Sequence, residues 1–460
     1  MTGMEQDDFS NVSWSEHVQE QTARVADDAA HSTDGAGGSG NNSHPHNDTD
    51  LGPETLDCVV GTPIKENDGT KDAFVSYLIT TNSTFPSFQR ENTTVRRRFT
   101  DFVFLYKQLM RDYPAAAVPP LPDKQRMEYV RGDRFGSDFT ARRGHSLQRF
   151  LIRLSLHPNL RRAPILHTFL ESPDWNATMR SRSTRGSSAS DSGSAGVFDN
   201  FADTFINAFT KVHRPDRRFL EVREKSDKLD DDLGHIEKVI ARVARRETDL
   251  EADLHDLAEQ FQKLIPLEPN VEPAVHAFAA SIEDTAADLR KLKDTTDQDY
   301  LGSLRDLQAY SLALKGLLKA REQKQLDHEQ LTEYLNKSTT ERDSLQTGHG
   351  SGSGAGGFLR SKIEDVRGVD HEQARRERTR KLEMRVEELT HEVESARNTS
   401  DMFDDEVVKE VAEFERIKRI EMKGQLGSFA DSHVEFYGQV IDTWERYVME
   451  MEKAGAVPAA

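Results

Sequence analysis

The residues best suited to bind a ligand are two adjacent arginines and two phenylalanines between positions 97 and 102. The order is Arg97-Arg98-Phe99, and Phe102 follows three positions after Phe99. An arginine guanidinium donates paired hydrogen bonds that match phosphate oxygens, and a flat aromatic ring can lie against a sugar ring beside it. This order of residues therefore indicates a site for a phosphorylated sugar ring.

Three strand-like runs and three helical runs must position this motif. Strands are expected over residues 56–65, 74–81 and 93–99, and Asn67-Asp68-Gly69 between the first two is a hairpin signal. The period then changes to that of a helix, and helices are expected over residues 100–113, 138–155 and 163–171. The sequence thus predicts a small α+β domain over residues 54–174, with the motif where the third strand meets the first helix.

A resemblance to a known family follows from the motif and the residues after it. Arg97-Arg98-Phe99 with Phe102, then the turn Pro119-Pro120-Leu121-Pro122 and Lys124, resembles the PX domain of sorting nexins. Domains of that family bind phosphoinositide lipids, so the resemblance implies a site for phosphatidylinositol 3-phosphate.

The resemblance also implies a role for each residue of the site. Arg98 matches the arginine that takes the 3-phosphate, and Phe99 matches the aromatic residue under the inositol ring. Lys124 matches the lysine near the 1-phosphate, and Arg143 the arginine that reads the free 4- and 5-hydroxyls. Thr100 stands where some members have an arginine, and its hydroxyl could donate one hydrogen bond.

Other residues near the motif allow two interpretations each. Arg97 and Arg142 are either auxiliary charges of the site or solvated and surface-paired residues. Core packing is the alternative for Phe99 and is expected for Phe102.

A loop after Lys124 carries apolar side chains that either insert into a membrane interface or pack back on the domain; these are Met127, Tyr129 and Val130.

Composition limits the classes of function. The 460 residues carry a net charge of −19, yet residues 51–174 are net positive, which indicates a local anionic partner and not a nucleic acid contacted along the whole chain. No stretch reaches the ~18–20 apolar residues needed to cross a bilayer, and the acidic N-terminus does not resemble a secretory signal. The single cysteine, Cys58, excludes an intramolecular disulfide and a cysteine-based zinc site and favours the cytosol.

The segments on either side of the small domain differ in composition. Residues 1–53 are acidic and poor in apolar residues, which predicts a disordered tail. Residues 175–196 are rich in Ser, Arg and Gly and are predicted to form a flexible linker. Residues 197–213 predict an amphipathic helix, either a membrane-interface helix or a clamp against the next domain. Its stripe contains Phe198, Phe201, Phe205 and Phe209.

Residues 216–454 are predicted to be helical throughout. Apolar residues alternate at spacings of four and three along three long runs, which are separated by Pro266 and by the Gly- and Ser-rich residues 348–357. The first run includes Leu233, Ile236, Ile240 and Val243, and the third includes Val440, Trp444 and Tyr447. We expect these regions to meet at the centre of a dimer, where two chains bury side chains that neither can bury alone. Glu247 interrupts the first seam and is interpreted as a device for register or partner choice.

Three antiparallel helices behind a PX domain resemble the BAR domain, a curved dimer that lies on membranes. The run from Arg367 to Gln373 and the tail from Phe436 to Arg446 are similar to a fungal, autophagy-related branch of the PX-BAR sorting nexins. The resemblance implies a cytosolic protein that is peripheral on endosomes and on the preautophagosomal structure. It also implies pairing with another PX-BAR sorting nexin, with a homodimer possible, and roles in retrieving SNARE-type cargo from endosomes to the Golgi and in selective autophagy.

The sequence also bears on two other classes of function, an enzyme and a tether. The chain lacks a Gly-rich phosphate loop, an H-E-x-x-H motif and a G-x-S-x-G motif, so we expect no catalytic residue, metal or cofactor. A vesicle or cytoskeletal tether with a lipid-binding head is the alternative, although the two breaks favour a folded arm. Basic clusters on the helices are either lipid contacts or solvated faces; they are Arg242, Arg245 and Arg246; Lys315, Lys319, Arg321 and Lys324; and Arg375, Arg376, Arg378, Arg380 and Lys381.

Overall fold

The computed structural model describes residues 53–70, 73–122, 135–186, 216–266, 272–346 and 371–453. Several predicted features lie outside these ranges. They are the N-terminal tail up to residue 52, Lys124, the apolar loop with Met127, Tyr129 and Val130, and the amphipathic helix with Phe198, Phe201, Phe205 and Phe209.

A three-stranded antiparallel sheet carries the motif. Strands β1 (Leu56–Glu66), β2 (Phe74–Ser83) and β3 (Asn92–Arg98) lie in that order. Asn67 and Gly69 in the β1–β2 turn have positive φ angles of 54° and 79°, the left-handed region that these two residue types tolerate best. The expected hairpin is therefore confirmed.

Helices of the small domain cover the sheet and supply most of its core. They are α2 (Phe99–Asp112), α4 (Ser137–Leu156), the 3₁₀ turn η1 (Leu160–Arg162) and α5 (Pro164–Glu171). Phe102, Phe150 and Phe169 are buried together, with the rings of Phe102 and Phe169 4.9 Å apart. The core assignment of Phe102 is confirmed. One further helix, α6 (Trp175–Gly186), forms in the first part of the predicted linker, and its Trp175 packs edge-on against Phe169.

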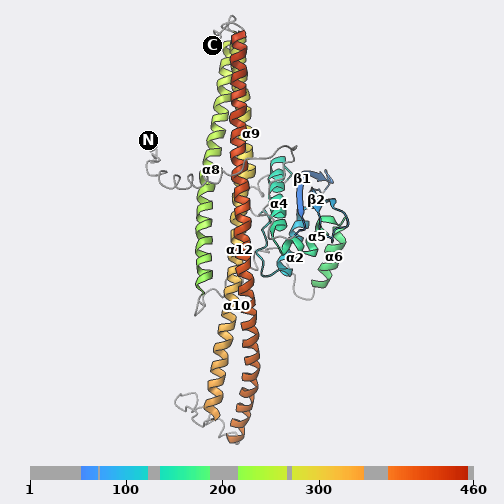
Figure 1. Ribbon diagram of the computed structural model, residues 1–460, viewed down its shortest axis with the longest axis vertical. Coiled ribbons are helices and arrows are strands. Elements are labelled where there is room, and N and C mark those ends of the chain that lie inside the picture. The colour runs from blue at the N-terminus through green and yellow to red at the C-terminus, as the bar shows by residue number, and fades with distance from the viewer. Residues whose placement is uncertain are drawn as a thin grey trace, which may run out of the picture. The chain divides into compact units, whose positions relative to one another are not determined.

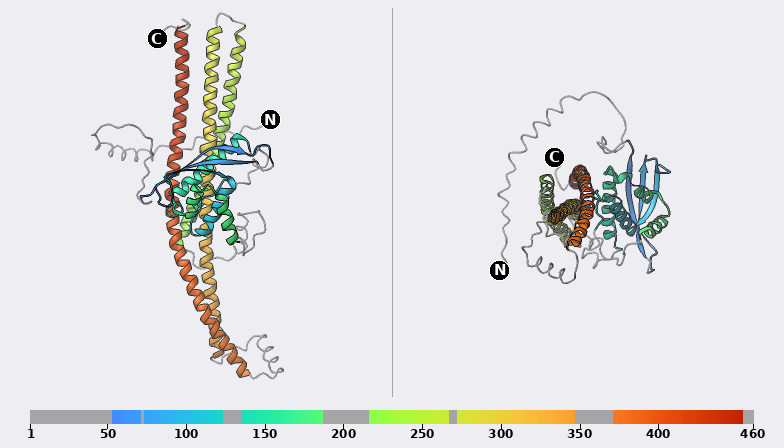
Figure 2. Two further views of the ribbon diagram at one scale, coloured as in Figure 1. Left: turned by 90° about the vertical axis from the view of Figure 1, so that its right-hand side faces the viewer. Right: turned by 90° about the horizontal axis from the view of Figure 1, so that it is seen from below.

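Three long helical stretches form the rest of the described chain. They are α8 (Arg217–Leu264), α9 (Glu272–Thr295) with its continuation, and α12 (His371–Lys453). The continuation runs through the π-helical turn η3 (Thr296–Leu301) into α10 (Gly302–Gln346). The stretches lie side by side (Figure 1), and α12 curves along its length as one unbroken helix (Figure 2). The expected three-helix arrangement is confirmed.

The first part of the expected dimer seam is instead buried within one chain. Leu233 is only 2% exposed and lies in a cluster with Tyr300, Leu304 and Leu307. Ile236 and Ile240 are half-buried against the same cluster. The expectation that Leu233 needs a second chain to become buried is therefore wrong, because η3 and α10 already cover it.

Trp444 and Glu247 also contact other helices of the same chain. Trp444 packs against Phe278 of α9, with ring centroids 5.6 Å apart. Glu247 is half-buried, and its Oε2 has no hydrogen-bond partner among the described residues. Burial raises the pKa of Glu247, an effect that His433 and Lys293 partly oppose. A partly buried acid within an apolar seam is a feature suited to specifying register.

Helix α4 lies between the sheet and the long helices (Figures 1 and 2). Its basic side chains form ion pairs with acids of the long helices at intervals of about one or two turns. Three arginine pairs are Arg142–Asp297 at 3.1 Å, Arg149–Asp306 at 2.7 Å and Arg153–Glu421 at 2.7 Å. Two histidine–carboxylate contacts accompany them, His145–Asp299 at 2.7 Å and, just past the helix end, His157–Glu410 at 2.9 Å. Arg142 thus has the pairing role that was one of its two interpretations.

Candidate functional site

Arg98 is the last residue of β3, and its side chain lies on the exposed face of the strand. The side chain is 44% exposed, and its Nε lies 3.3 Å from Oδ1 of Asp101. The backbone N–H of Arg98 donates to Oδ2 of the same carboxylate at 2.9 Å. Asp101 is buried in the first turn of α2, where a negative charge is favourable near the helix N-terminus. Asp101 therefore both starts the helix and orients Arg98.

Phe99 follows Arg98 in the chain and contacts Arg143. Phe99 is 9% exposed and belongs to the hydrophobic core of the small domain. The guanidinium carbon of Arg143, from α4, lies 4.4 Å from the centroid of the Phe99 ring. The structure thus brings Arg143 to the corner between β3 and α2, although Arg143 follows Phe99 by 44 positions in the sequence. Thr100 is exposed in the first turn of α2.

Arg97 points to the opposite face and is not part of this site. It is 3% exposed, and its guanidinium donates to the carbonyl oxygens of Phe169 at 2.9 Å and Ser172 at 2.5 Å. Burial lowers the pKa of Arg97 to about 10, which leaves the side chain a cation near neutral pH. Both interpretations of Arg97, as an auxiliary ligand charge and as a solvated or surface-paired residue, are therefore wrong, because its buried guanidinium joins β3 to the end of α5.

Two residues at the site were missed in the sequence. Asp101 orients Arg98, and Phe139 places its ring centroid 4.4 Å from the guanidinium carbon of Arg143. Each had a readable signal, since Asp101 is three residues after Arg98 and Phe139 is four residues before Arg143. Asp101 is the third residue of α2, the capping position for the residue that precedes the helix, and residues four apart, such as Phe139 and Arg143, lie on the same side of a helix.

The basic residues on the long helices differ in their exposure and pairing. Arg321 is buried and forms a two-point ion pair with Asp404, with both N···O distances 2.7 Å. Lys315 pairs with Asp227 at 2.6 Å and also with Asp230. These two residues hold helices together, so the interpretation of them as lipid contacts is wrong. The other two clusters, around Arg245 and Arg378, are exposed.

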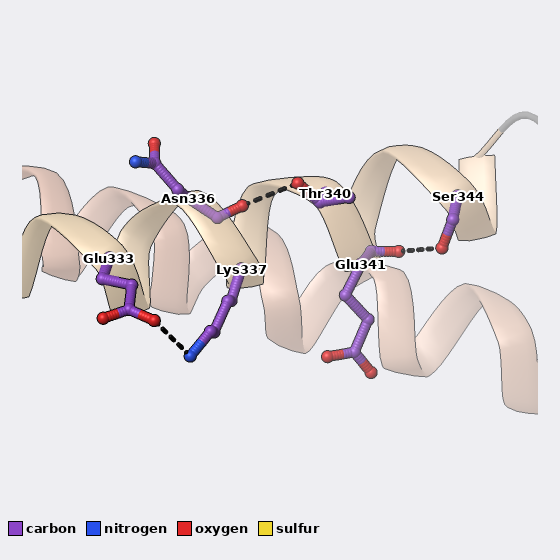
Figure 3. A pocket seen from close by; sticks show the side chains of 6 residues that line it. All are labelled: Glu333, Asn336, Lys337, Thr340, Glu341 and Ser344. Atoms are coloured by element: carbon purple, nitrogen blue, oxygen red, sulfur yellow. Dashed lines mark hydrogen bonds and ion pairs between the residues drawn. The ribbon is translucent and has the colours of Figure 1, made fainter.

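One hollow among the described residues does not resemble a binding site. It lies near the C-terminal end of α10 and is lined by that helix alone, with an ion pair of 2.7 Å between Glu333 and Lys337 (Figure 3). Within the described ranges, no three His, Cys, Asp or Glu side chains are grouped to hold a metal ion. No helix in the same ranges has the length and hydropathy to cross a bilayer.

The fold and the site together define a class of protein. A PX-type domain with an arginine–aromatic corner, joined to three long antiparallel helices, is the architecture of the PX-BAR sorting nexins. The family model described as "PX domain" matches residues 85–173. A cryo-EM structure of the SNX-BAR protein Mvp1, a tetramer, is similar in fold, with a TM-score of 0.50 and 18% identity over 85% of this chain and 99% of that one.

Full-length relatives specify the branch of that class. Sorting nexin-4 of Gibberella zeae is 81% identical over 100% of this chain and 99% of its own length. Sorting nexin-4 of Colletotrichum higginsianum is 70% identical over 98% of this chain and 95% of its own length. The chain therefore belongs to the sorting nexin-4 family. Members of the PX-BAR sorting nexins are non-enzymatic, peripheral membrane adaptors in trafficking, and this chain shares that general role.

Proposed function

We propose that this adaptor binds phosphatidylinositol 3-phosphate on endosomes and dimerises through its long helices. We further propose that it acts in retrieval of SNARE-type cargo from endosomes towards the Golgi and in selective autophagy. The observation that carries the lipid proposal is the corner where β3 ends at the exposed Arg98 and where Arg143 lies against the ring of the next residue, Phe99. The trafficking roles rest on the family resemblance.

The corner offers the groups that a 3-phosphorylated inositol ring requires. Arg98 is held by one carboxylate yet remains 44% exposed, so its remaining N–H groups can donate to a phosphate. The phosphate would lie near the N-terminus of α2, where helix N–H groups favour an anion. Arg143 would donate to the 4- and 5-hydroxyls, Thr100 would add one hydroxyl, and Lys124 would approach the 1-phosphate.

Dimerisation is supported by apolar side chains that one chain leaves exposed. On α8 these occur at intervals of four and then seven residues, the spacing of a coiled-coil seam; they are Val239, Val243, Leu250, Leu257 and Leu264. A second set lies on α12 and comprises Val434, Tyr437, Ile441 and Val448. Val434 is 72% exposed and Leu250 is 49% exposed. Apolar surface of this extent is suited to association, with another PX-BAR sorting nexin or with a second copy.

Vesicle flotation of the full chain tests the lipid proposal. Vesicles contain phosphatidylcholine alone or with phosphatidylinositol 3-phosphate, and the variant is Arg98→Ala. Loss of a charge-assisted phosphate contact is expected to weaken binding by about 2–4 kcal/mol. Arg111→Ala is the matched control, because it removes an exposed arginine from the other end of α2. Unchanged binding by Arg98→Ala would contradict the proposed site.

The same vesicles test selectivity. Because Arg143 is proposed to contact unphosphorylated hydroxyls, the 3-phosphate lipid should bind more tightly than the 3,5- and 4,5-bisphosphates. Equal binding of all three lipids would mean that charge alone drives attachment.

A further inference from the structure

We infer that Phe139 is a specificity-determining positioning residue, which holds the Arg143 guanidinium in the orientation that distinguishes a free hydroxyl from a phosphate. The inference rests on the proposed lipid function and extends it to a residue that does not itself contact the ligand. Its basis is that Arg143 lies 4.4 Å from the ring centroids of both Phe99 and Phe139.

The two rings come from different elements, so together they constrain Arg143 more than either could alone. Phe99 is at the start of α2 and is held in the core. Phe139 is in the first turn of α4, four residues before Arg143 and therefore on the same side of that helix. Contact of a guanidinium with aromatic rings is attractive and favours a limited set of orientations.

This constraint matters because an arginine guanidinium binds a phosphate more strongly than it binds a hydroxyl group. A mobile guanidinium can turn towards an added 4- or 5-phosphate and gain a charged hydrogen bond there. A guanidinium held against two rings keeps its donors in one direction, and that direction serves the hydroxyls. The Phe139 ring would thus lower affinity for the bisphosphorylated lipids relative to the 3-phosphate lipid.

The Phe139→Leu variant of the full chain tests this role. Binding is measured by flotation with vesicles of phosphatidylcholine containing either the 3-phosphate or the 3,5-bisphosphate lipid. Affinity for the 3-phosphate lipid is expected to fall about threefold to tenfold, the size of one cation–π contact. Affinity for the bisphosphate lipid should fall less or rise. The ratio of the affinity for the 3-phosphate lipid to the affinity for the bisphosphate lipid therefore decreases. Phe139→Tyr, which keeps the ring, should restore the wild-type ratio.

Two controls separate this role from a general effect on the domain. Phe104→Leu makes the same change at a half-buried ring whose partner is Trp175, at 5.8 Å, and should leave the ratio unchanged. A double-mutant cycle then tests whether Phe139 acts through Arg143: in an Arg143→Ala background, Phe139→Leu should have no further effect on binding.

The outcomes also separate this inference from the proposed function. If Arg98→Ala abolishes binding while Phe139→Leu keeps both the affinity and the ratio of the wild type, the positioning role is wrong and the site stands. Additive effects of Phe139→Leu and Arg143→Ala would overturn it as well. If Arg98→Ala binds normally, the proposed function itself fails.

Discussion

Residues next to each other in sequence can have opposite roles, as Arg97 and Arg98 show. Arg97→Met should leave the carbonyls of Phe169 and Ser172 unpaired in a buried place. We expect a loss of about 2–4 kcal/mol in the free energy of opening of β3 and α5, measured by amide hydrogen exchange. Arg96→Met, on the exposed face of β3, serves as the control. Equal protection of the β3 and α5 amides from hydrogen exchange in the two variants would contradict a structural role for Arg97.

His167 should make the stability of the small domain depend on pH. Its Nε2 lies 2.6 Å from the carbonyl oxygen of Arg161 and its Nδ1 2.6 Å from the hydroxyl of Ser87, so the neutral ring donates at Nε2 and accepts at Nδ1. Burial lowers the pKa of His167 from its ordinary value of 6.5. The native state therefore takes up a proton less readily than the unfolded state does.

The sign of this dependence follows from linkage. The contribution of His167 to the free energy of unfolding is complete above about pH 6.5. It is lost as the pH falls through the lower pKa that His167 has in the native state. Thermal unfolding between pH 5 and 8 should show stability that rises with pH. His167→Gln should have a flatter profile, and an unchanged profile in that variant would assign the dependence to another group.

At the scale of elements, α4 is the connection between the small domain and the long helices. Arg153 is 2% exposed and Glu421 is 10% exposed, so their ion pair is almost fully removed from water. Arg153→Met should leave the Glu421 carboxylate buried without its partner and cost about 3–5 kcal/mol. Hydrogen exchange should then increase in α4 and in the part of α12 around Glu421.

A second variant separates the pair from simple packing. Arg153→Met combined with Glu421→Met removes both charges and should recover much of the lost protection, because no charge is then left buried without a partner. If amide exchange in the double variant is as fast as in the single variant, then the packing of the Arg153 side chain, and not the ion pair, joins α4 to α12.

At the scale of the whole molecule, assembly should depend on the exposed seam. Leu250→Glu combined with Ile441→Glu places charges on surfaces that are 49% and 56% exposed in one chain. We expect sedimentation to show loss of association, by several kcal/mol, with helical circular dichroism unchanged. Ile236→Asp with Ile240→Asp should instead reduce helicity, because those side chains pack within the chain. Association that survives Leu250→Glu with Ile441→Glu would exclude this seam.

The sequence by itself determined the elements and indicated the class of protein. The period of two in β3, the period of about 3.5 in the long helices, Asn67 to Gly69, and Pro266 all act through local backbone preferences and side-chain spacing. Such signals need no distant contact, so the hairpin and the three long helical runs could be predicted. The arginine–aromatic motif and the residues after it indicated the PX domain for the same reason, because these residues are close together in sequence.

Only the tertiary structure decided which side chains remain available for function. Arg97 and Arg321 are chemically as suited to bind phosphate as Arg98, yet their burial against the carbonyl of Phe169 and against Asp404 gives them structural roles. Likewise, Leu233 and Leu250 follow the same heptad pattern, but η3 and α10 cover the first while the second remains exposed. A heptad pattern indicates that a residue needs an apolar partner. Whether that partner lies in the same chain depends on how helices distant in sequence pack together.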